Sequence, residues 1–397
     1  MMVCVSCLIG TLFLCASFTL PNEKIENNAA ISAEMLSTEG EYPKIINQLL
    51  FTELDNFTDA IIIANSSYNS DSAIIKKALK AERSETIYGK PLDSLYDYFI
   101  NNNDKTVSYE RYWHGYIIFI RPLLMLGNIM LIRILFAIIH LTLLFTLLYL
   151  LKQKTNIQVV ISFIIPYICG TLYMSPFSLQ YSPIMAIVLL SGIIILKHND
   201  YLIKKDCYPF LFLIVGILCS YLDFLTYPLL TLTMDLVFHF LLNKDQTKIS
   251  NLIIFTICWF IGYGGMWASK WIISSIILNE DIIKNAITAI AVRTSDTGQG
   301  FSLNIFNVTK QNICFICLQK FNIILLIFTL LFKFIDKKKI TIPNKNTVVS
   351  LLYVFILPFI WYAFTKNHSY IHAFFTYKCL VSSIFAILLL FDLSYNY

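Results

Sequence analysis

The apolar segments of this chain constrain its fold more than any other feature. Each of them approaches the roughly 20 residues that a helix needs to cross a bilayer, and helices satisfy every backbone polar group inside lipid. Only 14% of the residues are charged, whereas soluble domains carry about a quarter. The sequence therefore predicts an all-α integral membrane protein with about ten transmembrane helices. We place them at residues 2–20, 127–151, 157–174, 182–197, 207–222, 226–242, 250–273, 313–334, 347–365 and 371–391.

The lysines between these segments predict the orientation of the chain. One set of connections contains twelve lysines, and the short connections on the other side contain only Lys366. Because short basic loops stay in the cytoplasm, we expect the lysine-rich side to be cytoplasmic and the chain to lie in the plasma membrane. The twelve are Lys152, Lys154, Lys197, Lys204, Lys205, Lys244, Lys248, Lys333, Lys337, Lys338, Lys339 and Lys345.

This orientation divides the chain into three parts. Residues 1–20 form the first transmembrane helix, either a retained anchor or a signal peptide, and residues 21–111 form a large extracytoplasmic loop. Residues 112–397 contain an interfacial helix and the transmembrane bundle, with a second outer loop at 274–312. The interfacial helix is predicted from ERYWHGYIIFIRPLL, which mixes aromatic residues, arginines and a proline as segments at headgroup level do.

Charge and cysteine usage exclude two classes of protein. The formal net charge of +5 comes with lysines confined to short loops, so it does not indicate a nucleic-acid partner. The ten cysteines all lie in or beside apolar runs, and residues 21–111 contain none. A disulfide-stapled outer domain is therefore excluded.

Polar residues of the outer loops suggest a site for a phosphate-bearing lipid. Arginine binds phosphate through its fork of donors, and a carboxylate in the same cavity could deprotonate an acceptor. The loops supply arginines, histidines and acids together with helix-breaking prolines, and irregular backbone at membrane depth lines protein or a wet cavity. These features favour an enzyme that takes a group from a membrane-embedded phospholipid-type donor without ATP.

Several fragments resemble one family. ERYWHGYIIFIRPLL, SLQYSP, YLDFLTYP, GYGGMWASKW and KNHSYIHAFFTYK, together with one helix followed by a long outer loop, are similar to those of the GT-C-type integral membrane glycosyltransferases. The resemblance implies transfer of a sugar from a polyprenyl-phosphate donor to a glycan or lipid acceptor of the cell envelope. It also implies a catalytic carboxylate in the first outer loop and basic residues of later segments around the donor phosphate.

By this resemblance, the candidate catalytic residues are Asp59 first and Glu34 second. The candidate phosphate-binding residues are Arg111, His114, Arg121, Arg293, His368 and Lys378. No cofactor is assigned, although a divalent metal remains an option. No metal ligand set is evident, because His368 and His372 have the i, i+4 spacing of a metal pair but lack a third ligand.

Two other interpretations stay open. Asp235 and His239 lie one turn apart within the predicted span 226–242, where ionisable residues are costly unless they are paired. They form either a hydrogen-bonded pair between helices or a proton relay, and a relay would favour a transporter or a lipid-linked-sugar flippase. A non-catalytic membrane assembly protein is the third interpretation, since no catalytic carboxylate motif of the family matches cleanly.

Overall fold

The computed structural model describes the chain except for residues 48, 245–246, 299, 319, 336–342 and 394–397. Its described residues are almost entirely helical. Five helical stretches are long and apolar enough to cross a membrane, or up to seven if each of two bent pairs counts as one span. The five are α7 (Ile129–Lys154), α9 (Tyr181–Lys204), α12 (Ile249–Leu278), α16 (Lys345–Phe364) and Ala373–Leu393. The chain is therefore a multi-pass helical membrane protein.

Four shorter apolar helices complete much of the predicted series. They are α6 (Ile117–Leu126), α8 (Ile157–Cys169), α10 (Tyr208–Leu222) and α11 (Leu229–Leu242). The segment 207–242 is thus two helices, as predicted, and α6 begins in the predicted interfacial stretch and extends two residues beyond it. The final span comprises α18 (Ala373–Thr376), the 3-10 turn η3 (Tyr377–Cys379) and α19 (Leu380–Leu393).

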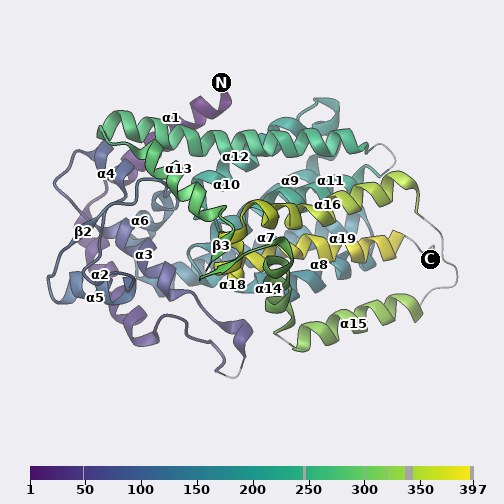
Figure 1. Cartoon of the computed structure of the whole chain (residues 1–397), viewed down its shortest axis with the longest axis horizontal. Coiled ribbons are helices and arrows are strands. Elements are labelled where there is room, and N and C mark those ends of the chain that lie inside the picture. Colours follow the sequence, from purple (N-terminus) through teal and green to yellow (C-terminus); the bar gives the residue numbers. More distant parts are fainter. Residues whose placement is uncertain (48, 245–246, 299, 319, 336–342, 394–397) are drawn as a thin grey trace.

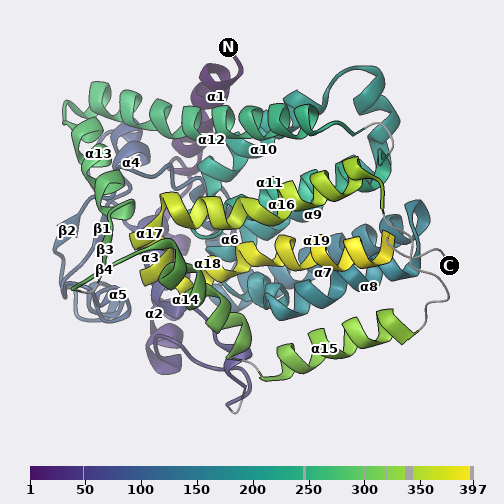
Figure 2. The same cartoon turned by 45° about the vertical axis from the view of Figure 1, so that its right-hand side comes forward.

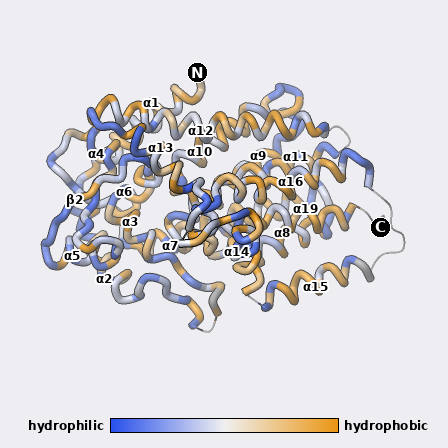
Figure 3. Tube along the Cα trace, in the orientation of Figure 1, coloured by the Kyte–Doolittle hydropathy of each residue, from blue (hydrophilic) through white to orange (hydrophobic). Residues whose placement is uncertain are grey.

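The long helices run roughly side by side, and the polar parts of the chain gather at their ends. α7, α9, α16 and α19 extend in one direction in both views (Figure 1, Figure 2). The hydropathy colouring is mostly orange along them and blue around α4 and β2 at one end (Figure 3). Such a separation is expected for a bundle whose middle lies in hydrocarbon and whose ends meet water.

The N-terminal segment differs from a straight membrane span. α1 (Met2–Ser17) crosses α12 at a steep angle in both cartoons (Figure 1, Figure 2). It is followed by α2 (Asn22–Glu39), which is bent by 86° relative to it. The two form a broken span or a re-entrant pair by length and composition, so the predicted 2–20 span is shorter and more tilted than its hydropathy suggested.

Residues 21–111 fold as a small helical unit at one end of the bundle. Its elements are α2, the 3-10 turn η1 (Leu50–Thr52), α3 (Asn56–Ser67), α4 (Ile74–Lys80), β1 (Arg83–Ser84), α5 (Pro91–Ile100) and β2 (Thr106–Val107). β1 and β2 pair antiparallel. The unit shares a hydrophobic core with α1 and α6, including Leu14, Ile25, Ile63 and Ile120.

The rest of the chain supplies short segments between the long helices. These are η2 (Leu172–Phe177), α13 (Ile282–Arg293), the antiparallel pair β3 (Thr297–Gly298) and β4 (Phe301–Ser302), α14 (Ile305–Cys317), α15 (Lys320–Ile335) and α17 (Lys366–Ile371). α14 and α15 form the second bent pair, at 87°. Near the end of α15, Lys333 pairs with the buried carboxylate of Asp392, and it also donates to Ser162 over 2.8 Å.

Two glycines allow the closest helix packing in the bundle. A Cβ on Gly216 of α10 would lie 2.2 Å from the carbonyl oxygen of Trp259, and one on Gly262 of α12 would lie 2.2 Å from that of Leu213. The two backbones therefore touch where a larger residue cannot fit. Close approach through small residues is a common basis for helix association in membranes, where lipid removes most of the hydrophobic driving force.

Candidate functional site

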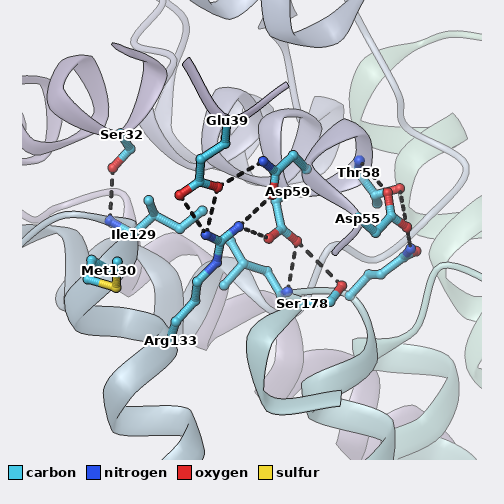
Figure 4. A network of polar contacts seen from close by, with 12 residues as sticks. Ser32, Glu39, Asp55, Thr58, Asp59, Ile129, Met130, Arg133 and Ser178 are labelled. Carbon is cyan, nitrogen blue, oxygen red and sulfur yellow. Dashed lines mark hydrogen bonds and ion pairs between the residues drawn. The ribbon is translucent and has the colours of Figure 1, made fainter. Parts of the chain in front are cut away.

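Asp59, the first candidate base, is a structural residue. Its side chain is fully buried, and its carboxylate lies 3.2 Å from the guanidinium of Arg133 in α7. It also accepts the backbone N–H of Leu179 over 2.8 Å. Arg133 donates further to Glu39 and to the side chain of Asn56, so one arginine ties α2 and α3 to α7 (Figure 4).

Burial explains why this ion pair is poorly suited to catalysis. It raises the pKa of Asp59 to about 7, although Arg133 and the Leu179 N–H favour the charged form. A catalytic base must reach substrate, and Asp59 lines none of the cavities described below. These contacts indicate a structural role for Asp59, and its assignment as the base stays a prediction. Glu34, the second candidate, lies on an exposed face of α2 and lines none of the cavities described below.

Two of the predicted phosphate ligands are also part of the packing. Both ring nitrogens of His114 have partners within the protein, the Tyr116 hydroxyl and the Tyr109 carbonyl, each at 2.7 Å. Burial lowers the pKa of His114 to about 3, so the ring is neutral. Arg121 is 1% exposed and donates to backbone oxygens of Ser17 and Ser66. Both side chains are therefore engaged within the protein, and their assignment as phosphate ligands stays a prediction.

The carboxylate that does reach a cavity is Asp55, four residues before Asp59. Asp55 is the N-cap of α3 and accepts the Thr58 N–H over 3.0 Å through Oδ1. Its Oδ2 accepts from the Tyr181 hydroxyl over 3.1 Å and from the Gln180 amide, both at the start of α9. Because Oδ1 has only the one partner among the described residues, it keeps a free lone pair. Burial raises the pKa of Asp55, which suits a base near neutral pH.

Asp55 and Lys378 line the same cavity, of about 160 Å³. We call it the carboxylate–lysine cavity. It lies where the 41–55 segment of the outer unit meets η2, the start of α9, the end of α14 and η3. Its remaining lining residues are Tyr42, Phe51, Glu53, Leu54, Thr171, Met174, Ser178, Tyr181, Phe315, Leu318, Phe374 and Tyr377. Glu53 supplies a second, exposed carboxylate whose pKa is raised by partial burial.

Lys378 is the one predicted phosphate ligand that the structure brings to this cavity. It is 4% exposed and donates to the Thr171 hydroxyl over 2.7 Å and to the Gly170 carbonyl over 3.1 Å. These groups follow the C-terminus of α8, where the helix dipole favours a cation. Among the described residues, no carboxylate forms an ion pair with Lys378. A buried ammonium held in this way can balance the charge of a bound anion.

Backbone strain occurs beside the lysine. Thr171 has φ 51° and ψ 31°, a left-handed conformation that costs a β-branched residue energy. The turn ends α8 and directs the Thr171 hydroxyl to Lys378 and to the Tyr377 hydroxyl, which lies 2.6 Å away. Strained residues of this kind are frequent at binding and catalytic sites, which supports the cavity as the candidate site.

The two other predicted arginines lie elsewhere, on a groove between α12 and α13. Arg111 and Arg293 both line it, and we call it the arginine groove. His368, by contrast, is a buried residue of α17, and its Nε2 contacts the Leu225 carbonyl at 2.7 Å. Burial lowers the pKa of His368 well below its usual value. Seven of the eight candidates are thus divided between structural contacts, the carboxylate–lysine cavity and this groove, and Glu34 lies apart on the exposed face of α2.

The buried acid of α11 does not form the pair that its sequence spacing suggested. Asp235 accepts a hydrogen bond from Ser191 over 2.8 Å, whereas the His239 ring packs edge-on against Tyr208. Asp223, at the break between α10 and α11, accepts from the Thr226 N–H and hydroxyl, which is a turn cap. In the described part of the chain, no cluster of three or more His, Cys, Asp or Glu residues could hold a metal ion.

Sequence reasoning missed Asp55, Glu53 and Arg133. Arg133 had a readable signal, because a charge within an apolar run is either paired or functional. Asp55 also had one, since an aspartate directly before a helical run is a typical N-cap, but a cap alone does not indicate a cavity. Its partners Gln180 and Tyr181 lie far away in the sequence and come close only in the fold.

Comparisons with known proteins give no family for this chain. No protein-family model, no curated protein and no solved structure matches it.

Proposed function

We propose that this chain is a membrane-embedded glycosyltransferase of the GT-C type, acting at the outer face of the plasma membrane. Its donor is a polyprenyl-phosphate sugar, and its acceptor is a glycan or lipid of the cell envelope. The observation that carries the proposal is the placement of Asp55 and Lys378 on one cavity at the junction of the outer unit and the bundle. Direct displacement needs a base and an anion-binding cation on the same cavity.

In the proposed reaction, each group has a distinct role. The Asp55 carboxylate takes a proton from the acceptor hydroxyl, which attacks the anomeric carbon of the donor sugar. The bond from that carbon to the donor phosphate breaks, and the lipid phosphate departs with the electron pair. Lys378, with the hydroxyls of Thr171 and Tyr377 beside it, stabilises the negative charge that develops on the departing phosphate.

The position of the cavity fits a lipid-linked donor. Phe315, Leu318 and Met174 give one side an apolar lining, so a prenyl chain could leave the cavity toward the α14–α15 junction. The proposed orientation places the cavity on the non-cytoplasmic side, since the lysine-rich connections belong to the opposite end of the helices. The proposal counts ten spans, with α6 as the interfacial helix and with the shorter apolar helices and both bent pairs included.

Release of lipid phosphate tests this function. Purified protein in detergent is incubated with polyprenyl-phosphate sugars and an acceptor extract, and free polyprenyl phosphate is measured. We expect release by the wild type and a loss of about 10²-fold or more in Lys378→Gln, the range seen when one transition-state donor is removed. The matched control is Lys310→Gln, which removes an exposed lysine of α14. Equal rates for the two variants, or no release from any donor, would contradict the proposal.

A transport function is the second candidate, and one observation favours it. Oδ2 of the fully buried Asp235 has no hydrogen-bond partner among the described residues. A cavity of about 250 Å³, lined by His239 and Asn243, begins one turn further along α11. Uptake of a labelled lipid-linked sugar into proteoliposomes, lost in Asp235→Asn and retained in Asp55→Asn, would support transport over transfer.

A further inference from the structure

The arginine groove has one apolar wall and one wall of small residues. Tyr263, Trp267 and Trp271 are spaced four residues apart on α12 and line one side. Ala286 and Ala289 of α13 line the other, and their short side chains leave a cavity of about 390 Å³. Residues at this spacing lie on one helix face. The groove is therefore open between two helices rather than filled by the α13 side chains.

A polar cavity adjoins the groove on the other side of α13. It has a volume of about 720 Å³ and shares Arg111, Ala289 and Arg293 with the groove. Lys284 adds a third cation to its lining, and Asp281 is its one acid. The Asp281 carboxylate is engaged as the N-cap of α13 by the Lys284 backbone N–H. The two guanidiniums thus stand where an apolar space meets a polar one.

Neither arginine has an acidic partner in the described part of the chain. Arg111 donates to the Asn285 side-chain oxygen over 2.7 Å and packs over the Tyr109 ring. Arg293 lies 2.7 Å from Nε2 of His372, a neutral acceptor in that contact. A guanidinium has five donors, so both retain donors for a ligand. Two unpaired guanidiniums on one cavity are complementary to an anion.

Two buried polar atoms of the groove are also without partners. Neither the Tyr263 hydroxyl nor the Trp267 Nε1–H has a hydrogen-bond partner of acceptable geometry among the described residues. Both atoms are enclosed by neighbouring groups and lie close to each other one turn apart on α12, so they add polar character to this wall without themselves indicating a ligand. Both residues line the aromatic side of the groove, next to the arginines.

We propose that the arginine groove binds a second phosphate-bearing lipid. Its anionic phosphate head lies between Arg111 and Arg293, and its hydrocarbon chain lies against Trp267 and Trp271. This site is separate from the carboxylate–lysine cavity, because the two share no lining residue. The inference does not depend on the proposed transfer reaction, and the chain would bind this lipid even if it transferred nothing.

Tryptophan quenching by brominated lipid tests the proposal. The purified protein in maltoside micelles is titrated with phosphatidic acid carrying bromine on its acyl chains, and the total fluorescence of its five tryptophans is followed, of which Trp267 and Trp271 line the groove. We expect saturable quenching, with dissociation constants at least tenfold higher in Arg111→Gln and in Arg293→Gln, because a lost charge-assisted bond has about that effect. Lys310→Gln is the charge-matched control and should bind as the wild type does.

Further arms exclude other ligands and a folding artefact. Brominated phosphatidylcholine, whose head is zwitterionic, should quench more weakly, and inorganic phosphate should not compete at equal concentration. Arg111→Lys and Arg293→Lys keep the charge without the fork, so they should bind with intermediate affinity if the arginines act as ligands. Equal quenching in the Gln variants would overturn the proposal. Competition by inorganic phosphate at equal concentration would show that the hydrocarbon chain of the lipid does not contribute to binding, and so would overturn the proposal. Undiminished quenching by phosphatidylcholine would overturn it too.

Discussion

Replacing Arg133 by methionine should destabilise the chain more than any single surface change. Met has a similar length but no donors, so the fully buried Asp59 loses the guanidinium 3.2 Å away and must either stay charged without a partner or take up a proton. Removing one partner of a buried ion pair costs about 3–5 kcal/mol. Arg133→Met also removes the bonds to Glu39 and Asn56, which places the expected loss at the upper end of that range.

The companion changes make this prediction specific to the ion pair. Asp59→Asn keeps an acceptor for the Leu179 N–H and should cost about 1–3 kcal/mol. The double variant should lose less than the sum of the two single losses, because each partner is costly mainly when it is left alone. The control is Lys90→Met, which breaks the exposed Lys90–Asp93 pair and should cost at most about 1 kcal/mol.

Equilibrium unfolding of the detergent-solubilised protein, followed by tryptophan fluorescence, measures all four variants. A loss in Arg133→Met no larger than in Lys90→Met would refute the reasoning, and so would strict additivity in the double variant. Either result would mean that Asp59 is solvated or neutral rather than paired, and that the outer unit is attached to α7 by other contacts.

Two further predictions follow from packing and from the titration of Asp55. Gly262→Ala should lower the free energy of unfolding by about 1–3 kcal/mol, because its Cβ would lie 2.2 Å from the Leu213 carbonyl oxygen. The control is Gly264→Ala, whose Cβ would meet nothing within 4 Å. Thermal melts should show this control to be neutral or slightly stabilising. Burial raises the pKa of Asp55, and a general base acts only when it is deprotonated. The transfer rate should therefore begin to fall on acidification at a pH above the usual aspartate pKa of about 3.9. A kcat/KM profile in which the acid limb lies at the ordinary value would contradict this.

The long helices could be predicted because lipid imposes a simple rule on sequence. α7, α9, α12 and α16 correspond to predicted spans, and α10 and α11 divide at the predicted break. Lys378 was also predictable, since a cation inside an apolar segment needs a partner or a ligand. Bends are harder to read, because α1 and α2 have enough apolar residues for one span and yet meet at 86°.

The sequence could not show which polar residues line a cavity and which are enclosed in the protein. Asp55 and Asp59 stand one helical turn apart in the same motif, yet one lines a cavity and the other is enclosed by Arg133. That difference arises from residues of α7 and from the segment before α9, which lie far away in the chain. A single sequence contains no information on which distant segments will meet.

The most direct measurement compares Asp55→Asn with Asp59→Asn in the transfer assay, each rate corrected for the folded fraction. Asparagine is as good an N-cap as aspartate, so Asp55→Asn keeps the cap of α3, and the correction for folded fraction accounts for the lost bonds from Tyr181 and Gln180. It should nevertheless lose transfer by about 10²-fold or more, as expected for a missing general base. Asp59→Asn should lower stability and keep its rate within about tenfold. If Asp55→Asn transferred as the wild type does, or if Asp59→Asn lost as much as Asp55→Asn, the carboxylate–lysine cavity would not be the active site.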